Sequence, residues 1–367
     1  MKRRLAIRDI AAGSGARAEG WLTIGETPGG PLRVPIVLIN GRNDGPVLCF
    51  TAGVHATEYA PIEAVVRLLG MLDPATLRGA VIGVPVTNMP MFEHRMGFVS
   101  PLDGLNLNKI APGRTDGSIS EILADVLLRE VIGQAQYHID FHAGDLGEQL
   151  LPFAGYSLTG RREMDAQGEA LVRVFTPWLM SVSAEGANVP PFPGSLNYSA
   201  TRNGVVSILA ESGGNGTLEE SDVETHVQGA TNVMRYLGMI DGTVAPNGPR
   251  VSARDRVVVR AARSGLLRLK VAIGDQISQA LGARLAVVLI GERPGLSAPD
   301  SLGVYITWAP GPGHTDAERN CVSNIRTQGL EYPDAAAKIT FYCNEARRLR
   351  YTGTALKEIN SPRITTG

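Results

Sequence analysis

Apolar runs of strand length alternate with amphipathic stretches between residue 33 and about residue 238. The apolar runs lie at residues 33–40, 47–52, 80–86, 137–144 and 205–210. Between them, apolar residues at helical spacing predict helices after Glu58, from Ser118, near 161–175 and from Thr217 to Leu237. This alternation predicts an α/β fold with a mixed, mostly parallel sheet and helices on both faces.

The pattern changes after Gly238. A small β domain is predicted by short apolar runs, separated by glycine-rich turns, at 257–259, 265–271 and 285–290. From about residue 309 the periodicity no longer fits that domain. We therefore expect three parts, which are a main domain over 1–240, a small C-terminal β domain over 241–308 and a tail without assigned structure over 309–367.

The composition narrows the classes of function and location. The chain of 367 residues is 44% hydrophobic and 19% charged with a formal net charge of −1, so it lacks the basic surplus expected for binding nucleic acid or an anionic membrane. No run of about 18 apolar residues is present to span a bilayer. The three cysteines form no CxxC pair and suit a reducing compartment. We expect a cytoplasmic protein, monomeric or homo-oligomeric, whose partner is a small molecule.

Side chains suited to metal binding stand at the carboxyl ends of three predicted strands. His55 and Glu58 follow one apolar run. His142 lies near the end of another, and Glu211 directly follows a third. Such ends share one edge of a doubly wound sheet and can converge on one crevice. Two imidazoles and one carboxylate, with a fourth position for water, form the donor set of a catalytic zinc site, so we expect one Zn²⁺ per chain on His55, Glu58 and His142. Another divalent ion can use the same donors.

Neighbouring residues leave two alternatives open. Alternation in the run at 137–144 places His138, Asp140 and His142 on one face of the strand. His138 is therefore an alternative ligand, although His142 lies nearer the end of the strand. Asp140 either orients a ligand or is a buried carboxylate near the turn. The turn at 212–216 lacks the lysine and Ser/Thr of a phosphate-binding loop, and we interpret it as a tight turn.

A hydrolytic site also needs a proton acceptor and a positive charge. Water beside a bound zinc ion becomes a nucleophile at neutral pH because its pKa falls to about 7, but a base must take its proton. Glu211 is the candidate for this general acid–base role. Arg95 is the candidate cation for the charge that develops on the carbonyl oxygen. It lies in a long aperiodic loop, residues 88–117, of a length that is uncommon unless the loop is functional.

Five short motifs enclose these candidates, in the order Gly53–Glu58, Asn88–Arg95, Leu105–Lys109, Asp140–Gly144 and Ala210–Gly213. In order and rough spacing, over about residues 35–240, they resemble the succinylglutamate desuccinylase/aspartoacylase family, a branch of the zinc carboxypeptidase-like fold. The segment 250–305 also resembles the small C-terminal β domain of that family.

This resemblance implies zinc-dependent hydrolysis of the amide bond in a small N-acylated amino acid or a related amide. It implies that zinc is held by His55, Glu58 and His142. It further implies that Glu211 is the proton shuttle and that Arg95 polarises the scissile carbonyl. The domain at 1–240 would then be the catalytic domain.

Two positions differ from the pattern of the family. Its Asn-Arg pair, which holds the substrate carboxylate, falls on Asn108 and Lys109. Lysine lacks the planar fork that binds a carboxylate through two bonds, which counts against an aspartoacylase-like or desuccinylase-like substrate. Ala56 replaces the usual glycine after the histidine, and the branch acting on acetylated diaminobutyrate in ectoine breakdown is closer in overall layout. The alternative functions are a carboxypeptidase, a lactam or ester hydrolase, and a non-catalytic metal- or ligand-binding relative.

Overall fold

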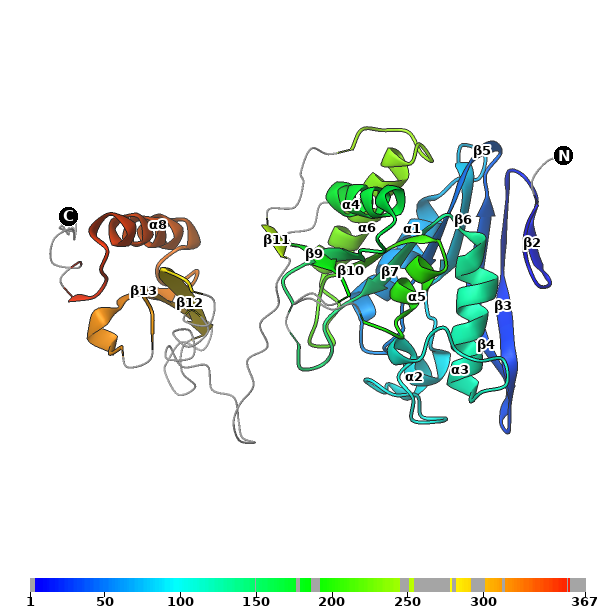
Figure 1. Cartoon of the computed structure of the whole chain (residues 1–367), viewed down its shortest axis with the longest axis horizontal. Coiled ribbons are helices and arrows are strands. Elements are labelled where there is room, and N and C mark those ends of the chain that lie inside the picture. Colours follow the sequence, from blue (N-terminus) through cyan, green and yellow to red (C-terminus); the bar gives the residue numbers. More distant parts are fainter. Residues whose placement is uncertain are drawn as a thin grey trace. The chain divides into compact units, whose positions relative to one another are not determined.

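The chain divides into two units, Met1–Arg256 and Val257–Gly367, in the computed structural model drawn in Figure 1. The structure describes residues 4–148, 150–175, 179–185, 192–244, 251–253, 278, 282–291, 301–311, 314–354 and 356. Within this part of the chain, no helix has the length and apolar character needed to cross a membrane. Each unit has its own sheet and core.

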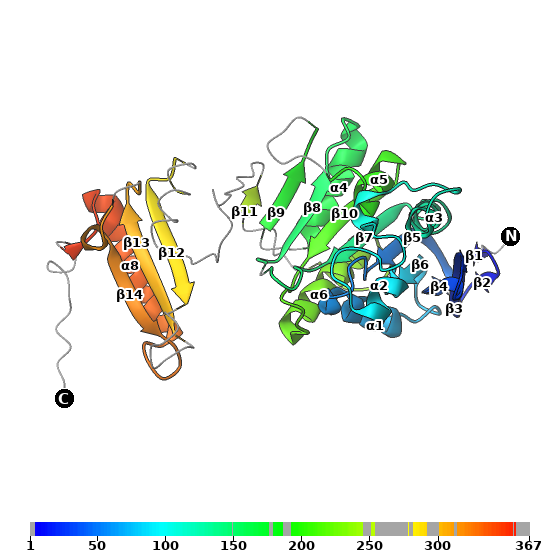
Figure 2. The same ribbon diagram turned by 90° about the horizontal axis from the view of Figure 1, so that it is seen from below.

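A nine-stranded mixed sheet forms the centre of unit 1, in the order β11-β9-β8-β10-β7-β5-β6-β4-β3 (Figure 2). Its strands are β3 (Ala16–Thr27), β4 (Gly30–Asn40), β5 (Asn43–Thr51), β6 (Arg78–Val84), β7 (Tyr137–His142), β8 (Phe153–Ser157), β9 (Leu179–Ser183), β10 (Val206–Glu211) and β11 (Val251–Ala253). The four neighbouring strands β10, β7, β5 and β6 run parallel to one another. Strand β8 is antiparallel to β10, and strand β4 is antiparallel to both β6 and β3. The predicted mixed, mostly parallel sheet is therefore confirmed. A separate hairpin, β1 (Leu5–Ile7) and β2 (Ile10–Ala12), precedes it.

Both faces of this sheet are covered, and the central strand β5 is buried on each side. Val47 and Cys49 belong to one core, and Leu48 and Phe50 to the other, which explains why the strand is continuously apolar. The first core is closed by α3 (Ile119–Val126), the π-helical η2 (Leu127–Val131) and α5 (Leu196–Arg202). The second core is closed by α1 (Tyr59–Met71), α4 (Arg162–Phe175) and α6 (Glu220–Tyr236).

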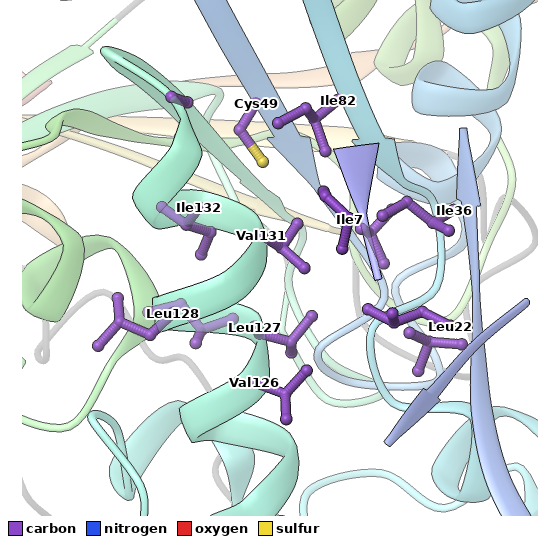
Figure 3. Close-up of a cluster of buried hydrophobic side chains, with 14 of the residues drawn as sticks. Ile7, Leu22, Ile36, Cys49, Ile82, Val126, Leu127, Leu128, Val131 and Ile132 are labelled. Atoms are coloured by element: carbon purple, nitrogen blue, oxygen red, sulfur yellow. The ribbon is translucent and has the colours of Figure 1, made fainter. Parts of the chain in front are cut away.

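Figure 3 shows part of the first core, where helix and strand side chains meet. The helix α3 begins as predicted, because Ser118 and Glu121 form a capping box. The helix α6 begins differently, because the Thr217 hydroxyl donates to Gly214 O and Glu219 is the N-cap residue. The sequence did not predict β8, β9 or α5, which are five, five and seven residues long. Such short elements offer too few positions for a clear period.

Unit 2 contains a three-stranded antiparallel sheet in the order β12-β13-β14. Its elements are β12 (Leu285–Gly291), β13 (Leu302–Trp308), η4 (Asp316–Glu318), β14 (Asn320–Ile325) and α8 (Tyr332–Leu349). Buried side chains of α8 and the sheet, Tyr342, Ala346, Val304 and Val322 among them, form its core. This sheet confirms a small C-terminal β structure and includes the run predicted at 285–290, whereas 257–259 and 265–271 lie outside the described residues. Because β13 pairs with β14, one sheet extends across the expected boundary at residue 308.

Candidate metal centre

The structure brings His55, Glu58 and His142 together at the carboxyl ends of β5 and β7. One ligand atom from each lies within 4.8 Å of the others. His55 Nδ1 is 2.6 Å from Glu58 Oε1, and His142 Nδ1 is 3.1 Å from Glu58 Oε2. The two strands are parallel neighbours with Thr51 opposite Asp140, so their ends lie side by side. Gly53 turns the chain after β5 with φ of 65°, a conformation that favours glycine.

Charge couples these three buried groups. Burial by itself lowers the pKa of His142, but the Glu58 and Asp140 carboxylates raise it well above the ordinary value. Burial raises the pKa of Glu58, but His142 and His55 outweigh this effect and lower it. The carboxylates of this group therefore favour positive charge in a site shielded from water, and a metal ion can take the place of the proton on His142.

The remaining nitrogens of both histidines face oxygen atoms. His55 Nε2 lies 3.3 Å from Asn106 Oδ1, and His142 Nε2 lies 3.4 Å from Asp140 Oδ2. When each Nδ1 binds a cation together with Glu58, the imidazole proton must be on Nε2, and these oxygens are placed to receive it. Glu58 Oε2 is buried and makes no hydrogen bond in the described part of the chain. These donors fit a divalent cation.

Asn106 is a site residue that the sequence did not single out. It is the N-cap of the 3₁₀ turn η1 (Leu107–Lys109), and its Oδ1 accepts a hydrogen bond from Asn108 N at 2.8 Å. The same oxygen faces His55, so one side chain fixes both the turn and the imidazole. The available signal was an asparagine followed by a short turn, which is common in loops without a ligand.

His138, the alternative ligand, lies apart from the three. It is fully buried in β7 between Thr51 and Ser207, and burial lowers its pKa to about 4. His226 is also fully buried. It lies at the inner side of α6, 3.2 Å from Ser212 O, and thereby contacts the turn that follows Glu211.

Glu211 is the last residue of β10 and lies beside the group formed by His55, Glu58 and His142. It is opposite His142 in the parallel register of β10 and β7. Burial raises the pKa of the Glu211 carboxyl to about 8, against a lowering influence of His142. A cation beside this carboxyl acts in the same direction as His142, because nearby positive charge favours the ionised form.

Arg95, Asn108 and Lys109 lie in the loop region between β6 and α3. Arg95 follows α2 (Met89–His94) with a left-handed φ of 53°, and its exposed guanidinium makes no hydrogen bond or ion pair within the described residues. Phe98 packs its ring against His55 with centroids 5.7 Å apart, so this loop borders the metal group. Lys109 is exposed, whereas Asn108 Oδ1 is buried and lacks a partner in the described part. In the described part of the chain, none of the three makes a polar contact with His55, Glu58 or His142.

Solved structures similar to this chain share its fold. A succinylglutamate desuccinylase/aspartoacylase from Rhodobacter sphaeroides is 26% identical, with a TM-score of 0.59, over 65% of this chain and 73% of that one. A succinylglutamate desuccinylase from Silicibacter sp. TM1040 is 20% identical, with a TM-score of 0.61, over 84% of this chain and 87% of that one. The ectoine utilization protein EutE (DoeB) from Ruegeria pomeroyi is 23% identical, with a TM-score of 0.58, over 65% of this chain and 72% of that one.

The C-terminal part is similar to a different family. Residues 230–357 match the model of the ethanolamine ammonia-lyase light chain (EutC). The ethanolamine ammonia-lyase small subunit of Bradyrhizobium diazoefficiens is 60% identical over 94 residues, which are 26% of this chain and 36% of that protein. The small subunit of Rhodopseudomonas palustris is 60% identical over 89 residues, which are 24% of this chain and 34% of that protein. The chain thus spans about a third of the length of these curated relatives.

The longer of the two family-model matches covers the part of the chain that contains His55, Glu58 and His142. Residues 44–237, more than half of the chain, match the model of the succinylglutamate desuccinylase/aspartoacylase catalytic domain. This range includes β5, β7 and β10, whose ends bear the candidate ligands and Glu211. The order of motifs, the sheet and the family model agree, and the chain belongs to the succinylglutamate desuccinylase/aspartoacylase family.

Proposed function

We propose that this protein is a zinc-dependent hydrolase that cleaves the amide bond of a small N-acylated amino acid or a related amide. The observation that supports it most is the group His55, Glu58 and His142. Both imidazoles have their Nδ1 near Glu58 and an oxygen near Nε2, and Glu58 Oε2 has no hydrogen-bond partner among the described residues. When bound there, zinc supplies a Lewis acid and lowers the pKa of a water molecule to about 7.

Glu211 is the group that moves the proton in this proposal. Its carboxylate takes a proton from the attacking water and returns it to the leaving amine nitrogen. Its place beside His142 in the register of β10 and β7 supports this role. Arg95 donates hydrogen bonds to the carbonyl oxygen as negative charge develops there, and its guanidinium has no competing partner in the described part of the chain.

Asn108 and Lys109 hold the substrate in this proposal. The exposed Lys109 ammonium pairs with the carboxylate of the amino-acid part as a single point charge. The side-chain amide of Asn108 forms further hydrogen bonds, which is supported by the unpartnered Oδ1. All of these residues lie within residues 1–240, which we propose as the catalytic domain. The three cysteines form no disulfide with one another, which supports a cytoplasmic location.

A substrate panel tests the reaction class. The full chain, first stripped of metal and then reloaded with zinc, is offered N-acyl amino acids, dipeptides, esters and lactams, and products are separated by chromatography. The proposal expects zinc-dependent release of a free amino acid from at least one N-acyl amino acid, faster than from any dipeptide or ester. Faster dipeptide or ester cleavage indicates one of the alternative hydrolases. Zinc uptake with no turnover of any compound favours a non-catalytic relative.

A further inference from the structure

A row of buried polar side chains extends from the metal group into the sheet. Asp140 Oδ1 accepts a hydrogen bond from the Thr51 hydroxyl at 2.6 Å. The same hydroxyl oxygen lies 2.8 Å from His138 Nε2, and His138 Nδ1 lies 2.8 Å from Ser207 Oγ. Thr51, His138 and Asp140 are 0% exposed and Ser207 is 3% exposed, so this row is shielded from water.

The strand register explains why these residues meet. Thr51 lies opposite Asp140 in the pair β5–β7, and His138 lies opposite Ser207 in the pair β7–β10. His138 and Asp140 are two residues apart on β7, so they occupy the same face of that strand. The row therefore crosses three adjacent strands on the face that ends at His142.

The protons in this row can be placed from the donor count. The single Thr51 proton is used on Asp140, so the bond between His138 and Thr51 needs the proton of His138 Nε2. A neutral imidazole has only one N–H, so His138 Nδ1 accepts from the Ser207 hydroxyl. Each donor in the row thus points toward Asp140.

The Asp140 carboxylate connects this hydrogen-bonded row to His142. Its Oδ1 is held by Thr51, and its Oδ2, which makes no hydrogen bond in the described part, lies 3.4 Å from His142 Nε2. His142 Nε2 makes no hydrogen bond in the described part either, so these two atoms are within ion-pair distance only. When Nδ1, which lies 3.1 Å from Glu58 Oε2, binds a metal ion, the imidazole proton must be on Nε2, where it faces Asp140. Thr51 therefore fixes the orientation of the Asp140 carboxylate, which in turn faces the candidate ligand His142.

We propose that Thr51, His138 and Ser207 are positioning residues of the metal centre, which set the Asp140 carboxylate and, through it, the tautomer and orientation of His142. This inference rests on the proposed function insofar as His142 binds a metal ion. It assigns no chemical step to the three residues. Partners of metal-binding histidines typically affect metal affinity about 10–100-fold, and the row acts one step further from the ion.

The test compares zinc affinity of two substitutions at Thr51 in the full chain. Dissociation constants are measured at one pH by competition with a chromophoric chelator. Thr51→Val keeps the shape of the side chain and removes the hydroxyl, and we expect zinc binding about tenfold weaker. Thr51→Ser keeps the hydroxyl and is expected to restore affinity to within about threefold of the unmodified chain. Thr201→Val is the control, because Thr201 is a buried threonine whose hydroxyl, among the described residues, bonds only to Asn197 O in its own helix.

A second pair of variants applies if Thr51→Val does not fold. Ser207→Ala removes one hydroxyl from the row, and Ser157→Ala removes one from a pair formed by the buried Ser157 and the partly buried Ser183 elsewhere in the same sheet. We expect zinc binding about threefold weaker in the first and unchanged in the second. The absorption bands of bound Co²⁺ should change in Thr51→Val or Ser207→Ala and stay unchanged in the controls. A general loss of stability does not produce such a change in the spectrum of the bound ion.

The outcomes separate this inference from the proposed function. An unmodified chain that takes up no divalent ion contradicts both. An unmodified chain that binds zinc, together with a folded Thr51→Val or Ser207→Ala variant of equal affinity and unchanged Co²⁺ spectrum, contradicts the inference alone.

Discussion

The two halves of the candidate site are held in different ways. The proposed metal-binding half lies at strand ends, and His55, Glu58 and His142 are 7%, 3% and 2% exposed. The proposed substrate-binding half lies in the loops between β6 and α3, where Arg95 and Lys109 are exposed and make no side-chain hydrogen bonds or ion pairs within the described residues. Strand register orders the first half before a ligand binds, whereas the second half must lose side-chain entropy on binding. Substitutions in the two halves should therefore differ in their effects on stability.

The largest effect is expected at Glu211, which lies at a strand end and to which we assign the proton transfer. Glu211→Gln should lower kcat by about 10²–10⁴-fold, because the amide cannot accept the proton, while the zinc content stays unchanged. Steady-state kinetics and metal analysis of the same sample measure both. Glu219→Gln, at an exposed glutamate before α6, is the matched control. Full turnover in Glu211→Gln removes this residue as the base.

Arg95 provides the sharpest contrast between catalysis and stability. Arg95→Ala should lower kcat about 10²–10³-fold, because a donor to the developing oxyanion is lost. The free energy of unfolding should change by less than about 0.5 kcal/mol, since the exposed guanidinium has no partner in the described residues. Arg114→Ala, at an exposed arginine of the same loop region, should change neither quantity. A large loss of stability in Arg95→Ala contradicts the proposed division into two halves.

Lys109 tests the substrate-binding half directly. Lys109→Arg should lower KM for an N-acyl amino acid about tenfold, because one added charge-assisted hydrogen bond is worth about 1.5 kcal/mol. A substrate analogue without the carboxylate serves as the control, and its KM should not change. Equal changes for both compounds show that Lys109 does not meet the carboxylate.

Asp103 tests how the substrate-binding loop is anchored, and its effect should be the smallest. Its carboxylate accepts hydrogen bonds from Ser120 N, Ser120 Oγ and Leu105 N. Burial raises the pKa of Asp103, but these bonds outweigh it and lower the pKa below the ordinary value. A lowered folded-state pKa means that this stabilisation is present above the unfolded pKa of about 3.9 and is lost as the pH falls through the folded value.

The corresponding experiment is thermal unfolding of Asp103→Asn and the unmodified chain between pH 7 and pH 3. The unmodified chain should be more stable at pH 7 by at most about 1 kcal/mol, since partial exposure to water weakens the effect. The difference should shrink toward low pH. A difference that grows as the pH falls is inconsistent with a lowered pKa.

The same contrast explains how far the sequence could predict the site. The meeting of His55, Glu58 and His142 followed from parallel strands whose carboxyl ends share one edge. The contact between Asn106 and His55 did not follow, because it depends on the path of an aperiodic loop. The burial of His138 between Thr51 and Ser207 also depends on the order of strands in the sheet, which hydrophobic runs do not reveal.

Helix α1 shows the corresponding limit for the fold. Its existence was predictable from the apolar residues at helical spacing after Glu58, but one of these residues, Val66, is 48% exposed. The buried face instead includes Ala60 and Ala64, which pack against Val223 of α6. Small residues allow two helices to approach closely and add little to a hydrophobic pattern, so the face that α6 covers could not be recognised from the sequence of α1 by itself.

The metal content of the purified full chain tests the central claim most directly. Elemental analysis should find about one zinc ion per chain, and His142→Ala should lose it while the Arg95→Ala variant keeps it. Zinc below about a tenth of an equivalent in the unmodified chain, with no uptake when zinc is added, contradicts a metal centre at His55, Glu58 and His142.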